Sequence, residues 1–113
     1  MTYLRQVDTE GMRASGERFR QSLHDRDDGA VASKIYCVSL PPGISSEGLH
    51  THQVEQCFFV IEGTLSVEIA GREYEAPPGT LVVTPPGTQH RNWNAGSERT
   101  TFLGIMGLVQ PPG

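Results

Sequence analysis

Residues 79–94 read GTLVVTPPGTQHRNWN, a stretch in which two short strand-like segments flank the turn sequence Pro85-Pro86-Gly87. Segments of this length that are rich in valine and threonine favour β-strands. A Pro-Pro-Gly sequence fixes a tight turn, because glycine accepts a positive φ. The stretch therefore predicts a strand over 80–84 and a second strand over 89–94 that carries His90. The turn sets the register in which His90 faces inward.

The same alternation of short strands and Gly/Pro turns extends outward in both directions. Strands are predicted over 18–23, 31–40, 56–62, 65–69, 72–76 and 99–106, and no segment keeps a helical period over a useful length. Leu65, Val67 and Ile69 alternate with Ser66 and Glu68, so the first three are expected to face the interior and the other two solvent. The pattern predicts an all-β sandwich or barrel.

Length and charge exclude several classes of function. The chain has 113 residues, which fits one domain over 1–113. Its net charge is −4 and its nine lysines and arginines are scattered, which counts against nucleic-acid binding and against a basic membrane patch. The longest apolar run, 57–61, is far too short to span a membrane, and the N-terminal residues do not resemble a signal peptide. A cytoplasmic location is therefore expected.

Two cysteines, Cys37 and Cys57, lie in apolar surroundings. Reduced thiols within the core are the favoured interpretation, and a disulfide or a metal-binding pair is the alternative.

The histidines are the candidate metal-binding residues. Two of the four form the sequence His50-Thr51-His52. Residues i and i+2 of a strand point to one face, so both imidazoles can approach one atom, and Gln56 has the same parity. His90 comes from another strand. Three imidazoles and an amide oxygen converging in an apolar interior would hold a divalent transition metal. Hydrogen-bonded or surface histidines are the alternative.

Two spaced motifs connect these residues to a known family. The first runs over 43–63 and contains Gly43, the two histidines, Gln56 and Gly63; the second runs over 79–94 and contains Gly79, Pro85, Gly87, His90 and Asn94. They resemble the two motifs of the cupin superfamily, G-x5-H-x-H-x(3,4)-E-x6-G and G-x5-P-x-G-x2-H-x3-N. The second motif matches throughout, and the first has one extra residue between Gly43 and His50.

The resemblance implies a small single-domain cupin with an antiparallel jelly-roll β-barrel. It also implies one bound divalent metal (Fe, Mn, Ni or Zn) with His50, His52, Gln56 and His90 as ligands. Members are commonly homodimers, often formed by exchange of N-terminal strands. The family usually has glutamate where this chain has Gln56. Glu55 is the alternative ligand if a bulge reverses its parity, and loss of the metal is a further alternative.

An all-neutral ligand set would leave the ion its full +2 charge and attract an anionic small molecule. The leading hypothesis is an enzyme that uses the metal as a Lewis acid: an isomerase, cyclase or lyase acting on a carboxylate- or carbonyl-bearing substrate. A cupin dioxygenase and a non-catalytic ligand binder or sensor are the alternatives. The sequence names neither the substrate nor the catalytic residues.

Parity proposes the residues around the site. Phe58 and Val60 share a face with Gln56, and Asn92 shares one with His90, so these three are expected to line the ligand cavity. Ordinary core packing is the alternative for Phe58 and Val60, and a turn position for Asn92. Tyr36 is a candidate acid or base. Trp93 has the opposite parity to His90, so it is expected to face outward and contribute to a dimer interface.

Overall fold

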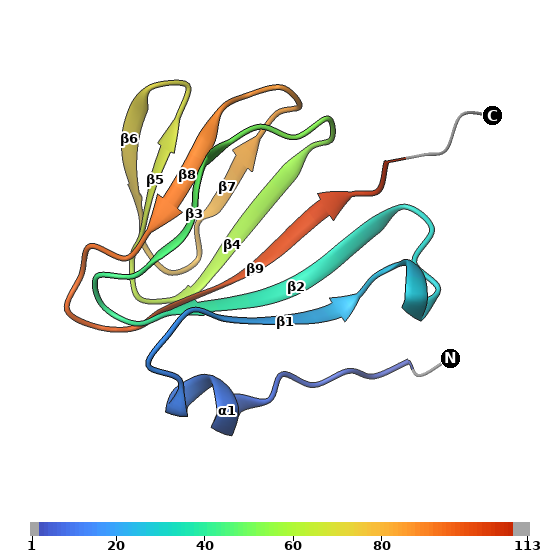
Figure 1. Cartoon of the computed structure of the whole chain (residues 1–113), viewed down its shortest axis with the longest axis horizontal. Coiled ribbons are helices and arrows are strands. Elements are labelled where there is room, and N and C mark those ends of the chain that lie inside the picture. Colours follow the sequence, from blue (N-terminus) through green and yellow to red (C-terminus); the bar gives the residue numbers. More distant parts are fainter. Residues whose placement is uncertain (1–2, 110–113) are drawn as a thin grey trace.

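The computed structural model describes residues 3–109, in which two antiparallel sheets face each other (Figure 1). One sheet has five strands, in the order β1 (Phe19–His24), β2 (Ser33–Leu40), β9 (Thr100–Gly107), β4 (Gln56–Glu62) and β7 (Leu81–Thr84). The other has four, in the order β3 (Ser45–His50), β8 (His90–Trp93), β5 (Leu65–Ile69) and β6 (Arg72–Ala76). The all-β jelly-roll is confirmed, but the two sheets do not close into a continuous barrel.

Turn residues decide where most strands end. β4 and β6 have the predicted bounds, because Gly63 and the Ala70-Gly71 pair between strands adopt a positive φ that ends each run. Adding a Cβ to Gly63 would place it 2.4 Å from the carbonyl oxygen of Arg99, so this turn also needs glycine for a close approach to the chain. A 3-10 turn, η1 (Arg26–Asp28), lies in the polar segment before β2.

One helix escaped the sequence prediction. Helix α1 (Thr9–Ala14) is only six residues long, too short to show a hydrophobic period. Asp8 caps it by accepting a hydrogen bond from the amide of Gly11 at 3.0 Å, and Met12 is its buried residue. No helix within residues 3–109 is long and apolar enough to cross a membrane.

The hydrophobic core fills the space between the two sheets. Its buried members include residues of both: Tyr36, Val38, Leu40, Phe58, Val60, Leu65, Val67, Ala76, Val82 and Phe102. On β5 the predicted inward facing of Leu65 and Val67 is confirmed, whereas Ile69 is only partly buried. The expectation that Ser66 faces solvent is wrong, because Ser66 is only 1 % exposed. It lies between its cross-strand neighbours Glu75 and Trp93, and its hydroxyl donates to the Glu75 carboxylate at 2.9 Å.

The lack of a side chain at Gly104 shapes the interior of the five-stranded sheet beside the histidines. Tyr36 on β2, Gly104 on β9 and Phe58 on β4 form one row across three strands. A Cβ at residue 104 would lie 2.1 Å from the ring of Tyr36, so the ring lies directly over the glycine. The absence of a side chain at Gly104 lets Tyr36 reach across β9 toward β4.

Candidate metal centre

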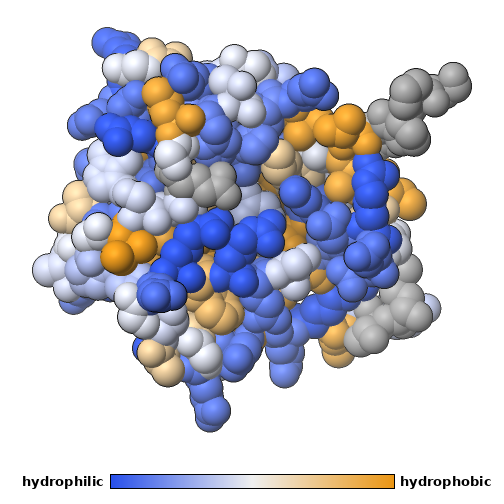
Figure 2. Space-filling view, in the orientation of Figure 1, coloured by the Kyte–Doolittle hydropathy of each residue, from blue (hydrophilic) through white to orange (hydrophobic). Residues whose placement is uncertain are grey.

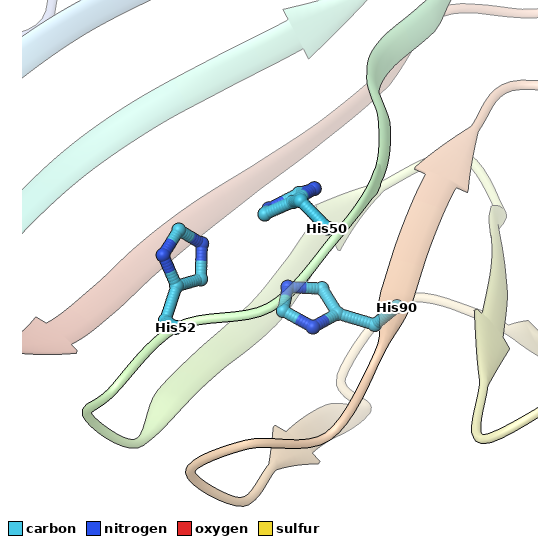
Figure 3. A group of neighbouring side chains, drawn as sticks. All are labelled: His50, His52 and His90. Carbon is cyan, nitrogen blue, oxygen red and sulfur yellow. The ribbon is translucent and has the colours of Figure 1, made fainter.

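Three histidines meet between the sheets. His50 ends β3, His52 lies two residues further along the following loop, and His90 begins β8. Their rings are directed toward a common point in Figure 3, and one nitrogen from each lies within 4.8 Å of the others. The Nε2 atoms of His50 and His52 are buried from solvent. The strand ends before His52, so the loop, and not regular strand parity, brings this ring to the group.

Backbone carbonyls determine which nitrogen of two rings carries the hydrogen. Nδ1 of His50 lies 2.6 Å from the Gly48 oxygen, and Nδ1 of His90 lies 2.9 Å from the Thr88 oxygen. A carbonyl oxygen can only accept, so each Nδ1 donates and each neutral ring presents its Nε2 lone pair to the centre. Hydrogen bonds of this kind orient the histidine ligands of metal sites.

The Pro85-Pro86-Gly87 turn contacts two of the three histidines. Gly87, at φ +77°, donates its amide hydrogen to the carbonyl oxygen of His52 at 2.8 Å. Its neighbour Thr88 supplies the carbonyl that accepts from His90. The Pro-Pro-Gly turn therefore contacts one histidine of the first motif and positions the histidine of its own motif.

Gln56 joins the group from the opposite sheet. It is 6 % exposed, and its Oε1 lies 2.8 Å from Nε2 of His90. Its Nε2 donates to the hydroxyl of Tyr36, and in this arrangement the amide oxygen lies on the side of the histidines. Because His90 donates through Nδ1, the Gln56 oxygen and the His90 nitrogen direct lone pairs at each other. A cation bound close to both atoms would satisfy both lone pairs.

These residues fit a transition-metal ion. Nitrogen and oxygen atoms bound about 2.1 Å from one ion lie about 3 to 4 Å apart, so small side-chain rotations would bring the donors into range. Imidazoles with a neutral oxygen ligand suit Zn, Ni, Fe or Mn. Glu55 is exposed and its backbone oxygen accepts from the amide of Gly107, an arrangement that leaves Gln56 as the side chain beside His90.

A cavity of about 90 Å³ lies next to the histidines. Of the predicted ligand-binding residues, Tyr36, Phe58 and Asn92 line it, whereas Val60 is fully buried in the core and does not. Asn92 is 5 % exposed on β8, not in a turn, and its Oδ1 is buried with no hydrogen-bond partner among the described residues. A buried acceptor without a partner beside a cavity is suited to a ligand hydroxyl or amine.

Trp93 lies away from this cavity, as its parity predicted. It lines a different depression, together with Leu49 and Arg91, and the Arg91 guanidinium stacks 4.7 Å above its ring. Neither Cys37 nor Cys57 lines the metal-site cavity. Both are free thiols, and burial raises the pKa of each, so they are poor nucleophiles.

The remaining motif residues hold the two motifs together. Asn94 is 1 % exposed and its side-chain nitrogen donates to the carbonyls of Leu40 and Glu98. The backbone oxygen of Asn94 accepts from the amide of Gly43 at 2.8 Å. These contacts join the start of the first motif to the end of the second and place no functional group in the cavity.

Sequence reasoning missed the cations of the cavity. The cavity is lined by three cations: Arg18 just before β1, Arg20 on β1 and Lys34 on β2. Met106 and Phe102 line it as well. Their facing depends on the pairing of β1 with β2, which local sequence does not reveal. The only available signal was the alternation of Arg18 and Arg20 with Phe19 in a predicted strand.

Comparison with known proteins agrees with the geometry. None of the curated proteins compared with the chain matches its sequence. Solved structures do match. The polyketide cyclase RemF from Streptomyces resistomycificus is 26 % identical, with 86 % of this chain and 69 % of that chain covered and a TM-score of 0.74. A predicted oxalate decarboxylase from Thermotoga maritima is 25 % identical, with 88 % of both chains covered and a TM-score of 0.75.

An RmlC-like cupin from Methanocaldococcus jannaschii is 14 % identical and shows the fold alone, with 95 % of this chain and 91 % of that chain covered and a TM-score of 0.77. The family described as "Cupin domain" matches residues 36–106, which include all three histidines and Gln56. The chain therefore belongs to the cupin domain family.

Proposed function

We propose that the protein is a metal-dependent enzyme acting on a small anionic molecule, with His50, His52, His90 and Gln56 as the metal ligands. The observation that supports this most directly is the meeting of the three histidine nitrogens with the Gln56 oxygen across the two sheets. A divalent ion held there would supply Lewis acidity toward a carbonyl or carboxylate of the substrate.

The chain's own residues would do the rest of the work. Asn92 would accept a hydrogen bond from a substrate hydroxyl through its partnerless Oδ1. Phe58, whose ring packs 5.3 Å from that of Phe102, would keep the inner wall of the cavity apolar and exclude water. Tyr36 accepts from Gln56 and therefore directs its own hydrogen elsewhere, so it is the candidate to give or take a proton at the substrate.

Isomerisation, cyclisation and lyase reactions all fit this set of residues. The printed descriptions of two similar structures, a polyketide cyclase and a predicted oxalate decarboxylase, support a reaction at a carbonyl or carboxylate carbon. Ligand sensing without catalysis and oxygen-dependent chemistry are the competing functions, and metal identity together with oxygen consumption separates them.

The first experiment measures metal binding. Protein freed of metal is titrated with Mn, Fe, Co, Ni and Zn under anaerobic conditions, and metal content is measured after dialysis. One ion per chain is expected. His50→Ala, His52→Ala and His90→Ala should each lower the affinity by well over tenfold, because each removes a direct ligand.

His24→Ala is the matched control, since His24 lies on β1 and is not part of the histidine group. It should retain wild-type affinity. Equal loss in all four variants, or no stoichiometric binding by a correctly folded wild-type chain, would contradict the metal assignment.

A further inference from the structure

We infer that the cavity recognises substrates with two anionic groups, one held at the metal centre and the other by Arg20 and Lys34. This rests on the proposed function for the first group and adds a second subsite, which selects dicarboxylates over monocarboxylates. The subsite consists of the two cations that project from β1 and β2 into the same cavity as the histidines.

Strand pairing places both cations on the inner face. Arg20 pairs with Val38, which is fully buried, and cross-strand partners share a face. Lys34 pairs with Met106, which in turn pairs with Gln56, so all three form one row across β2, β9 and β4. Two strand spacings separate Lys34 from Gln56, about 10 Å between their Cα atoms. The long lysine side chain can cover much of that distance.

Tyr36 connects the cations to the candidate metal centre. The guanidinium of Arg20 lies 4.4 Å from the centre of the Tyr36 ring, and the hydroxyl of the same ring accepts from Gln56. Stacking fixes the plane of the guanidinium while its N–H edges stay available for a carboxylate. The two subsites are thus separated by about one aromatic ring, which suits a short dicarboxylate.

The positive charges that line the cavity favour the binding of an anion. Neither Arg20 nor Lys34 forms an ion pair with a described residue, and no described acidic side chain lines the cavity. Three of the nine lysines and arginines of a chain with net charge −4 gather here, Arg18 being the third. Arg18 donates to Ser46 at 3.2 Å. Hydrophilic side chains gather over β1 and β2 in the middle of the face shown in Figure 2.

The test compares matched ligands. Metal-loaded protein is titrated calorimetrically with succinate and with propionate, which is succinate with one carboxylate replaced by hydrogen. Malonate and glutarate, one methylene shorter and one longer than succinate, define the preferred length of the dicarboxylate. Wild type should bind the best dicarboxylate about tenfold or more tighter than propionate, as expected for one charge-assisted hydrogen-bonded contact. Arg20→Gln and Lys34→Gln should each reduce this preference, and the double variant should abolish it with propionate binding unchanged.

Arg72→Gln is the control, because it removes one positive charge from an exposed position on β6. It should leave the preference intact. Equal affinity of wild type for the mono- and dicarboxylates, or an equal loss in Arg72→Gln, would overturn the inference even with metal bound normally. If no metal binds, the proposed function fails. In that case, succinate binding to the metal-free chain would still support the second subsite if the binding depends on Arg20 and Lys34. No succinate binding to the metal-free chain would reject the subsite.

Discussion

The side-chain amide of Gln56 lies between the Tyr36 hydroxyl and the His90 ring. An amide side chain can present either its oxygen or its nitrogen, and only the oxygen can bind a metal ion. The Tyr36 hydroxyl accepts from the Gln56 nitrogen, and the Gln56 oxygen lies toward His90. Gly104 makes this contact possible by leaving room for the ring. Three residues from three strands therefore place one proposed ligand.

Removing that hydroxyl should weaken metal binding without removing a ligand. Tyr36→Phe is expected to lower metal affinity about tenfold or more, the usual effect of losing a residue that orients a ligand. Tyr74→Phe, at an exposed position on β6, is the control and should change nothing. Competition against a chelator of known affinity measures both. An unchanged Tyr36→Phe affinity would mean that Gln56 is oriented without this hydrogen bond or does not bind the ion.

Some residues of the candidate site could be predicted from the sequence, and others could not. The spacing of His50, His52 and His90 within two motifs was sufficient to expect their convergence. The facing of Tyr36 was not predictable, because a strand buried on one side and covered on the other shows no clear alternation. Arg20 and Lys34 were missed because charged residues in strands ordinarily face solvent, whereas both line the cavity here.

At the scale of elements, helix α1 is attached to the five-stranded sheet by a polar network. Arg13 of α1 forms an ion pair with Glu62 at the end of β4 at 2.8 Å. Thr101 of β9 donates to the same carboxylate at 2.6 Å, and Arg99 donates to the backbone oxygen of Ser15 just after the helix. A short helix without a long apolar face is held in place by these contacts.

This network predicts a pH dependence. Burial raises the pKa of Glu62, but hydrogen bonds from Thr101 and Arg13, with the charges of Arg13 and Arg99, outweigh it and hold the pKa below its ordinary value of 4.5. The carboxylate therefore stabilises the fold fully above pH 4.5, and that stabilisation is lost as the pH falls through the lower, folded-state pKa.

Glu62→Gln should be less stable than wild type at neutral pH, and the difference should shrink as the solution is acidified. Urea unfolding across a pH series measures it. Glu73→Gln, an exposed position on β6, should track wild type at every pH. A constant difference between Glu62→Gln and wild type would show that ionisation of Glu62 contributes nothing.

At the scale of the whole molecule, the outer face of the five-stranded sheet carries a large apolar surface. It consists of side chains between 37 % and 52 % exposed: Phe59, Ile61, Leu81, Val83 and Ile105. Phe59 pairs with Leu81, while Val83 and Ile105 flank Cys57 from the two neighbouring strands, so these side chains form a continuous patch. Contiguous apolar surface on a small domain is typical of an interface.

We expect a homodimer that buries this face, rather than one formed around Trp93, whose ring is already covered on one side by Arg91. Light scattering should give twice the chain mass of 12.3 kDa. Leu81→Lys should give the monomer mass, whereas Tyr74→Lys, an equally exposed apolar position on the other sheet, should not. Dissociation by Trp93→Ala and not by Leu81→Lys would favour the Trp93 surface instead.

The architecture as a whole was the most predictable level. Regular Gly/Pro turns between short apolar segments predict the bounds of β4 and β6, whereas β3 was not among the predicted strands. Closure was not predictable in the same way. Whether two sheets join into a barrel depends on hydrogen bonds between edge strands that are distant in sequence, and no local pattern records them.

The position of the proposed ligands on both sheets has a consequence for how the protein folds. Gln56 belongs to the five-stranded sheet, whereas His50 and His90 belong to the four-stranded one. A nascent chain that had built only one sheet would present an incomplete set of donors, so tight metal binding at the proposed site would follow the docking of the sheets. Once bound, the ion would crosslink the two layers and slow their separation, because its binding energy becomes part of the barrier to unfolding. Cellular metal supply would then set the lifetime of the folded protein.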